Sequence, residues 1–166
     1  MQIKKYILSF IITFLFLINS SSVSAYITPD FDLYAKSTVV YNIDKDMIVY
    51  SENADVQRAP ASLTKVMSSL MILESTNDYS MKITVTDQML AGLAAANASV
   101  MGLHSGEVIS IRDLLYGLLL PSGGDAANVL AFYHSGSVEA FIQAMNVRAK
   151  ELGVNNTVFK TPTGLD

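Results

Sequence analysis

A serine and a lysine separated by two residues are the first candidates for chemistry in this chain. The segment Ser62-Leu63-Thr64-Lys65 follows Ala59-Pro60-Ala61 and opens an apolar helical pattern. A serine hydroxyl is a weak nucleophile near neutral pH and needs an adjacent unprotonated base, which a helical i, i+3 spacing supplies. With eighteen serines and eight lysines in 166 residues, about one such spacing arises by chance. The surrounding sequence must therefore support the inference of serine acyl transfer.

Two features of the predicted helix favour an uncharged amine at Lys65. A helix that begins near Ala61 places this lysine in its first turn, where the positive end of the helix dipole disfavours an ammonium by roughly 0.3–1 kcal/mol. Burial among Leu63, Val66 and Met67 would lower the lysine pKa further, because desolvation disfavours the charged form. The alternative is a serine N-cap followed by a solvated lysine, and these residues alone leave it open.

A second serine lies in a glycine-flanked loop between two predicted helices. Pro121 ends an apolar helical run, Ser122-Gly123-Gly124 follows, and Asp125 is expected to cap the next helix. A hydroxyl presented in this way can approach Ser62 and Lys65 and pass a proton to a leaving amine. The alternative is a simple turn that stops the helix.

Other catalytic classes find less support in the sequence. Both histidines, His104 and His134, lie in loop-like stretches, and the chain has neither a His-Glu-x-x-His nor a Gly-x-Ser-x-Gly motif. The chain has no cysteine, which excludes thiol nucleophiles, disulfides and thiolate metal sites. We expect no cofactor and no metal.

The elements that must position these residues form an α+β pattern. Runs of β-branched and aromatic residues predict an antiparallel hairpin, with strands at 37–42 and 47–51 around the polar loop 43–46. We further predict a strand at 82–86, a turn at 103–107, and helices at 61–74, 86–90, 110–120, 125–133 and 137–152. The stretch 91–99 has no clear pattern. Ser110 and Asp113 have the spacing of a capping box, and Gly153 is expected to end the last helix.

The apolar positions predict which side of each helix is buried. We expect the first long helix to bury Leu63, Val66, Met67, Leu70 and Leu73. We expect the helix before Pro121 to bury Leu114, Leu115, Leu118 and Leu119. We expect the last helix to carry one apolar face composed of Val138, Phe141, Ile142, Met145, Ala149 and Leu152.

Residues 1–25 have the pattern of a secretory signal sequence. Lys4 and Lys5 precede an uncharged run, and small residues at 23–25 predict cleavage after Ala25. The alternative is a membrane anchor, but the apolar run 7–18 has twelve residues, whereas about 20 are needed to span a bilayer. We therefore expect a secreted protein of the extracytoplasmic cell envelope.

The remaining residues, 26–166, are sufficient for one domain with its own core. They carry nine basic and fifteen acidic side chains, a net charge of −6. This acidic balance argues against nucleic acid as a partner.

Three segments together make the chain resemble the D-alanyl-D-alanine carboxypeptidases, low-molecular-mass penicillin-binding proteins of the serine D,D-peptidase family. They are 59–65, 112–123 and 163–166, and the resemblance covers most of 37–166. It implies a β-lactamase/transpeptidase-like α+β fold, a helical region plus an antiparallel sheet. It also implies that residues 26–166 are the N-terminal part of the peptidase domain, without the C-terminal strands that complete the sheet.

The resemblance also implies an activity and residue roles. Ser62 would attack the peptide bond between two D-alanines of a peptidoglycan stem peptide, forming an acyl-enzyme that water hydrolyses. Lys65 would be the general base, and Ser122 would pass protons between base and leaving group. β-Lactams would acylate Ser62 as substrate mimics. Membrane association would require a C-terminal anchor in a longer chain.

Two departures from the family pattern keep other functions open. Gly124 stands where the family commonly has asparagine, and the chain lacks a Lys-Thr-Gly motif. Lys160-Thr161-Pro162 is not a substitute for it, because proline cannot donate a backbone N–H. The alternatives are a β-lactamase-like hydrolase, although class A β-lactamases carry Ser-Asp-Asn at the second motif, and an inactive fragment or wall-peptide binding module.

Overall fold

The structure is a computed structural model, and it describes residues 30–93 and 98–165. The chain divides into two units, one up to Gln57 and one from Arg58 onward. The predicted signal sequence lies outside the described residues, as do residues 94–97 of the stretch left without a predicted structure. In the part of the chain that is described, every helix is too short or too polar to cross a bilayer.

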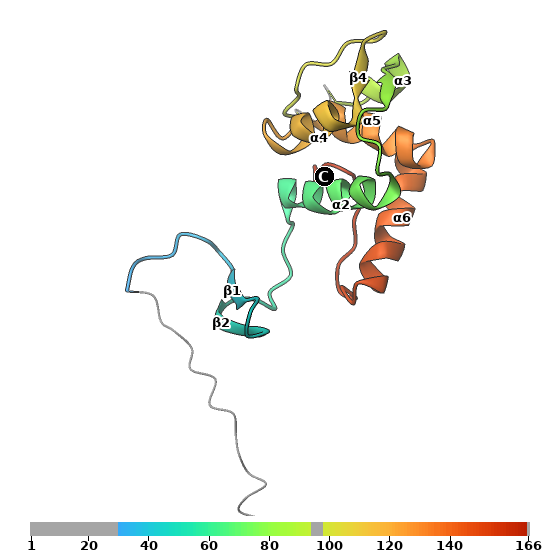
Figure 1. Cartoon of the computed structure of the whole chain (residues 1–166). Coiled ribbons are helices and arrows are strands. Elements are labelled where there is room, and N and C mark those ends of the chain that lie inside the picture. Colours follow the sequence, from blue (N-terminus) through green and yellow to red (C-terminus); the bar gives the residue numbers. More distant parts are fainter. Residues whose placement is uncertain (1–29, 94–97, 166) are drawn as a thin grey trace, which may run out of the picture. The chain divides into compact units, whose positions relative to one another are not determined.

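The first unit contains the predicted hairpin. Strand β1 (Thr38–Asn42) pairs antiparallel with β2 (Met47–Glu52), with an irregularity in the register between Val40 and Tyr41. Both strands appear in Figure 1. Val39, Val40, Tyr41 and Ile48 are exposed, because a sheet of two strands offers little surface for burying apolar side chains.

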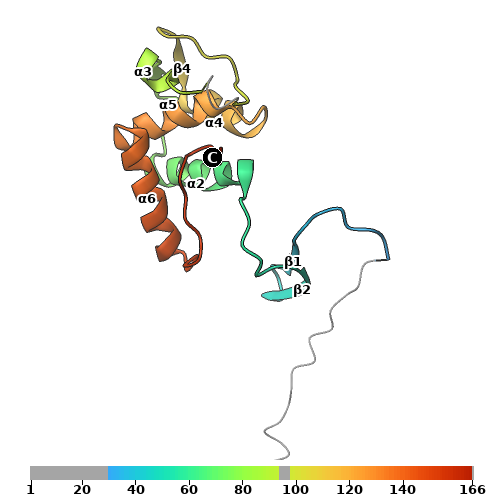
Figure 2. The same ribbon diagram turned by 180° about the vertical axis from the view of Figure 1, so that it is seen from behind.

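The second unit is mainly helical and carries all the candidate site residues. Its elements are η1 (Ala61–Leu63), α2 (Thr64–Ser75), β3 (Lys82–Thr84), α3 (Asp87–Leu90), β4 (Val108–Ser110), α4 (Ile111–Leu119), α5 (Gly124–Ser135) and α6 (Val138–Glu151). Helix α5 contacts α2, α3, α4 and α6. The two opposite views show α2, α4, α5 and α6 packed together, with the segment after α6 returning alongside α2 (Figure 1, Figure 2).

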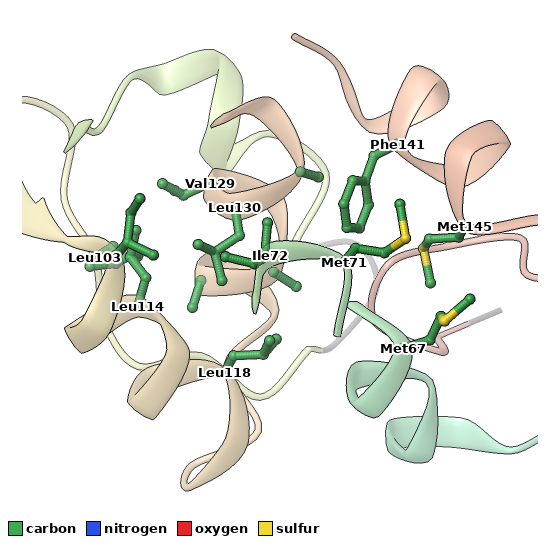
Figure 3. Close-up of a cluster of buried hydrophobic side chains, with 14 of the residues drawn as sticks. Met67, Met71, Ile72, Leu103, Leu114, Leu118, Val129, Leu130, Phe141 and Met145 are labelled. Atoms are coloured by element: carbon green, nitrogen blue, oxygen red, sulfur yellow. The ribbon is translucent and has the colours of Figure 1, made fainter. Parts of the chain in front are cut away.

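One hydrophobic core joins these four helices (Figure 3). The contributors from α2 are methionine and isoleucine, and those from α4, α5 and α6 are aliphatic, aromatic and methionine side chains. The labelled members are Met67, Met71, Ile72, Leu103, Leu114, Leu118, Val129, Leu130, Phe141 and Met145, all of them buried. Every described residue of the core lies between Met67 and Ala149. The second unit therefore has its own core.

A small sheet borders this helical unit. Strands β3 and β4 are antiparallel, with Ile83 opposite Ile109. The β3 prediction is confirmed over three residues, but β4 was not predicted. A strand of three residues has too little alternation to be recognised, and its partner lies far away in the sequence.

The prediction of which α2 residues are buried was largely wrong. Leu63, Val66 and Leu73 are exposed, with Leu63 at 73% and Val66 at 61%. The buried residues of α2 are Thr64, Lys65, Met67, Ser68, Ser69, Met71 and Ile72. Polar groups occupy much of this face because hydrogen bonds compensate their burial.

Helix α4 begins as predicted, and its buried face is narrower than predicted. The side chain of Ser110 caps it by accepting a hydrogen bond from the backbone N–H of Asp113. Leu114 and Leu118 are fully buried, whereas Leu119 is exposed and Leu115 is only partly buried. The helix is therefore amphipathic, as expected for a helix at the surface of the unit.

The predicted cap of α5 was also wrong. Gly123 is the N-cap residue, and Asp125 lies inside the first turn. The Asp125 carboxylate accepts hydrogen bonds from the backbone N–H groups of Met101, Gly102 and Leu103, in addition to Ala126 of its own helix. These partners are distant in the sequence, so a local pattern could not identify them.

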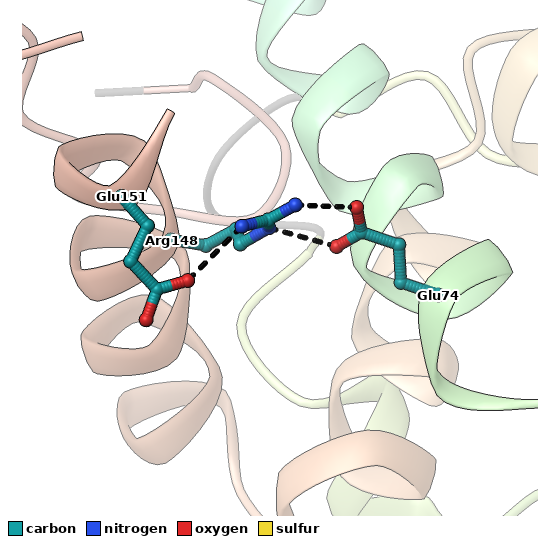
Figure 4. A network of polar contacts seen from close by, with 3 residues as sticks. All are labelled: Glu74, Arg148 and Glu151. Carbon is teal, nitrogen blue, oxygen red and sulfur yellow. Dashed lines mark hydrogen bonds and ion pairs between the residues drawn. The ribbon is translucent and has the colours of Figure 1, made fainter. Parts of the chain in front are cut away.

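Helix α6 and the segment after it close the unit. Ser137 caps α6, and Phe141, Met145 and Ala149 form its buried face. Arg148 of this helix forms an ion pair with Glu74 of α2 and another with Glu151 (Figure 4). The side-chain amide of Asn146 forms two hydrogen bonds with the backbone of Phe159, which direct the following residues back along α2.

Candidate active site

Ser62 lies in a tight turn that leads into α2. Pro60 precedes the short 3-10 helix η1, and the N–H of Leu63 donates to the Pro60 carbonyl at 3.2 Å. Ala61 has a positive φ of 48°, in the left-handed region that a residue with a Cβ rarely adopts. Ser62 itself is exposed, so its hydroxyl is accessible from outside the unit. Backbone strain of this kind is common at functional sites.

Lys65 is buried one turn further along the chain. It is 4% exposed, and this burial lowers the pKa of its amine below the ordinary value of 10.5. The direction of the predicted shift is confirmed. The surroundings differ from the prediction, because Leu63 and Val66 are themselves exposed.

Ser122 lies in the loop between α4 and α5. Leu120 ends α4 with a hydrogen bond from its N–H to the Tyr116 carbonyl. Ser122 then adopts a positive φ of 62°, and Gly123 begins the cap of α5. The predicted loop is confirmed. Ser122 is the second residue of the site region, after Ala61, whose backbone adopts a left-handed conformation.

The three predicted residues meet at one oxygen atom. The Ser62 Oγ is 3.2 Å from the Lys65 Nζ and 3.0 Å from the Ser122 Oγ. Both distances permit hydrogen bonds. An uncharged amine and a second hydroxyl at a serine oxygen are the groups that proton removal and proton transfer require. The roles of these residues in catalysis stay a prediction.

A further partner of Lys65 lies far away in the sequence and was not predicted. The Lys65 Nζ also donates to the backbone carbonyl of Thr163 at 3.0 Å, and Ser68 Oγ donates to the Pro162 carbonyl at 2.7 Å. The segment 161–165 thereby covers the inner face of α2. Gly164 permits this close approach, because it has a φ of 78° and a Cβ there would lie 1.8 Å from the Ala61 carbonyl oxygen. Thr163 belongs to a segment that carries the family resemblance, but no local pattern predicts its contact with Lys65.

Gly124 and segment 160–162 have clear structural roles in this unit. A Cβ on Gly124 would lie 3.2 Å from the Ala98 Cβ, and its N–H donates to the Ser99 carbonyl at 2.7 Å. The absence of a side chain lets residues 98–99 pack closely here. Residues 160–162 are not part of a strand, and Pro162 is buried against α2.

A cavity of about 460 Å³ opens beside the three residues. Ser62, Lys65 and Ser122 line it together with Leu63, Val66 and Leu119. This combination of a few polar groups with apolar walls is typical of small-molecule sites.

The described residues contain no group of three or more histidine, aspartate, glutamate or cysteine side chains arranged to hold a metal ion. Asp125 is buried three residues after Ser122, and its carboxylate oxygens accept hydrogen bonds from four backbone N–H donors.

Comparison with known proteins places this chain among peptidases. A family model described as D-alanyl-D-alanine carboxypeptidase matches residues 22–166. The D-alanyl-D-alanine carboxypeptidase DacF of Bacillus subtilis is 38% identical over 131 residues, which cover 79% of this chain and 34% of that protein. DacC of Escherichia coli is 37% identical over 140 residues, covering 80% of this chain and 34% of its own length. The chain thus spans about a third of the length of these curated relatives.

Solved structures give the same result for the fold. The Streptomyces K15 DD-transpeptidase aligns with a TM-score of 0.76 and 33% identity, covering 82% of this chain and 55% of that chain. The D-alanyl-D-alanine carboxypeptidase DacD of Francisella tularensis aligns with a TM-score of 0.76 and 33% identity, covering 86% and 34%. The predicted α+β transpeptidase-like fold is confirmed over the part that this chain covers.

Proposed function

Because the chain belongs to the D-alanyl-D-alanine carboxypeptidase family, we propose that Ser62, Lys65 and Ser122 form the acyl-transfer site of a serine-type D-Ala-D-Ala carboxypeptidase. Its substrate is a peptidoglycan stem peptide that ends in D-Ala-D-Ala. The observation that supports this most is the position of Ser62 Oγ, 3.2 Å from the Lys65 amine and 3.0 Å from the Ser122 hydroxyl.

The proposed reaction begins with proton removal from Ser62. The Lys65 amine takes the hydroxyl proton while Ser62 Oγ bonds to the carbonyl carbon between the two D-alanines. The C–N bond then breaks, and a proton from Lys65 reaches the leaving amine by way of Ser122. D-Alanine departs and leaves an acyl-enzyme on Ser62.

Water completes the proposed cycle. It gives a proton to the uncharged Lys65 and bonds to the acyl carbon, the ester bond to Ser62 breaks, and Ser62 Oγ regains a proton. Burial lowers the Lys65 pKa, and this direction favours the uncharged amine, which must accept a proton twice in the cycle.

The sequence pattern of residues 1–25 places this activity outside the cytoplasm in our proposal. A secretory signal leads to the cell envelope, where peptidoglycan is the available substrate. β-Lactams are the expected inhibitors, since an opened lactam ring would remain on Ser62 as an ester.

A labelled penicillin tests the nucleophile. We expect a covalent adduct on Ser62, identified by mass spectrometry of the peptide that contains it, and no adduct in Ser62→Ala. Ser69→Ala is the matched control, because the hydroxyl of this buried serine donates to the Val66 carbonyl within its own helix, and the variant should label like the unmodified chain. The assignment fails if no adduct forms or if the adduct persists in Ser62→Ala. Rapid turnover of a chromogenic cephalosporin instead of trapping would favour a β-lactamase-like hydrolase.

A wall-peptide binding module is the second candidate. It is favoured by Gly124, which has no side-chain amide to offer to Lys65 or to a substrate. Calorimetry with a D-Ala-D-Ala peptide distinguishes the two, since binding without release of D-alanine supports the module.

A further inference from the structure

Asp125 is the most buried acidic side chain near the proposed site, although it contacts none of the three proposed catalytic residues. It is 2% exposed. Its Oδ1 accepts hydrogen bonds from the N–H groups of Met101 and Ala126, both at 2.9 Å. Its Oδ2 accepts from Gly102 at 2.8 Å and Leu103 at 3.0 Å. One carboxylate thus holds three consecutive N–H groups of a distant segment against the first turn of α5.

The segment held by Asp125 is also the support of the Ser122 loop. The Gly124 N–H donates to the Ser99 carbonyl at 2.7 Å, and the Gly123 N–H donates to the Gly117 carbonyl at 2.9 Å. Met101 packs closely on Gly117, because a Cβ added to Gly117 would lie 2.0 Å from the Met101 sulfur. Residues 99–103, which we name the support segment, therefore contact the loop through Ser99 and are bonded to Asp125 through Met101, Gly102 and Leu103.

The carboxylate is charged in this environment. Burial by itself raises the pKa of the Asp125 carboxyl, but hydrogen bonds from Leu103, Met101, Gly102 and Ala126 more than offset this and leave the pKa below its ordinary value of 3.8. Hydrogen bonds to an ionised acceptor are stronger than those between neutral groups. The attachment of the support segment is therefore firm.

Ser122 needs firm surroundings. Its φ of 62° is unfavourable for a residue with a Cβ, and such conformations persist only where neighbouring structure enforces them. The enforcing contacts here are those of Gly123 and Gly124 with α4 and the support segment.

We propose that Asp125 is a positioning residue, whose carboxylate fixes the support segment and thereby keeps the Ser122 hydroxyl within hydrogen-bonding distance of Ser62. The importance of this positioning for catalysis rests on the proposed function. The geometry of the positioning can be tested without any catalytic activity, because the chain contains no cysteine.

The test is a disulfide between the two serine positions. In the full chain carrying Ser62→Cys and Ser122→Cys, thiols replace oxygens that are 3.0 Å apart, so a disulfide should form in a glutathione redox buffer. The equilibrium constant against glutathione measures how well the two positions are held together. Adding Asp125→Asn to this double variant replaces one carboxylate oxygen, an acceptor, with an NH₂ group, whose donors face backbone N–H donors. We expect the equilibrium constant for disulfide formation to fall at least tenfold.

Two further variants separate positioning from general damage. Asp113→Asn makes the same chemical change on an exposed acid at the start of α4, and it should leave the constant unchanged. Gly102→Ala strains only the support segment, because its φ is 97° and nothing lies within 4 Å of the added carbon. It should lower the constant in a chain with unchanged circular dichroism, even if Asp125→Asn disturbs the fold.

The possible outcomes are distinct. Unchanged disulfide formation in both Asp125→Asn and Gly102→Ala would overturn the proposal, as would failure of the pair to cross-link when Asp125 is present. Cross-linking that depends on Asp125 supports the positioning role even if penicillin leaves no adduct on the unmodified chain. In that case the proposed function fails and the positioning role stands.

Discussion

At the scale of single residues, the buried polar groups of this site depend on partners that are placed to suit their charge state. Lys65 has two acceptors, the Ser62 hydroxyl and the Thr163 carbonyl, and both are uncharged. An uncharged amine suits these partners, whereas an ammonium would be desolvated with no anion among them. Asp125 is the opposite case, because four N–H donors stabilise its negative charge.

The lowered Lys65 pKa leads to a prediction about stability. The folded chain binds fewer protons at Lys65 than the unfolded chain between the lowered pKa and the ordinary value of 10.5. The free energy of unfolding contributed by Lys65 therefore rises with pH through that window. Urea denaturation from pH 7 to 10.5 should show the unmodified chain gaining stability relative to Lys65→Met as pH increases. Ser62→Ala, which retains the lysine, is the control, and parallel curves for Lys65→Met and the unmodified chain would contradict the prediction.

At the scale of elements, each of the three candidate site residues lies at a helix boundary. Ser62 precedes α2, Lys65 lies in its first turn, and Ser122 follows the end of α4. Helix ends expose backbone groups and side chains that helix interiors bury, so a boundary can present a hydroxyl while the helix itself anchors it. The boundaries must therefore be well defined, and the starts of α4 and α6 are defined by capping serine side chains that accept hydrogen bonds from backbone N–H groups.

Removal of the α4 cap should show its contribution. Ser110 Oγ accepts from the Asp113 N–H at 3.1 Å, and Ser110→Ala leaves that N–H without its partner. We expect a loss of about 1 kcal/mol in the free energy of unfolding, measured by urea denaturation. Ser110→Asn keeps a capping oxygen and should recover most of the loss. Equal destabilisation by both variants would show that the cap does not hold the helix start.

At the scale of the whole molecule, the second unit is closed by the last part of its sequence. The segment 161–165 packs on the inner face of α2, where Ser68 and Lys65 donate to consecutive carbonyls at Pro162 and Thr163. This contact buries the amine of Lys65 and joins the two ends of the unit. This contact therefore stabilises the unit and also sets the surroundings of the Lys65 amine.

A pair of neighbouring serines allows this closure to be tested. Ser68→Ala leaves the Pro162 carbonyl buried without its donor, and we expect a loss of about 1–3 kcal/mol in the free energy of unfolding. We also expect slower labelling by penicillin, because Lys65 and Ser68 hold the same segment. Ser69→Ala removes only a bond within α2 and should have little effect on urea denaturation. Similar small changes in both variants would mean that the segment does not depend on Ser68.

Much of this architecture follows from contiguous residues. The i, i+3 spacing of Ser62 and Lys65, the proline that ends the helical run before Ser122, and the capping serine at 110 each act over a few residues. A helix, a cap or a turn forms from neighbours along the chain, and its pattern can be read from the order of side chains. The candidate site residues and most element positions were predictable for this reason.

Other features depend on contacts that no local pattern contains. Leu63 and Val66 looked like core residues and are exposed, whereas Lys65 and Ser68 are buried, because carbonyls 98 and 94 residues away receive their hydrogen bonds. Asp125 looked like a helix cap, but it binds N–H groups at 101–103. Hydrogen bonds between distant segments arise only when the helices pack and bring their backbones together. Residue order was thus enough to propose the three candidate site residues, and only packing of the helical unit placed the amine, the two hydroxyls and their supports within hydrogen-bonding distance.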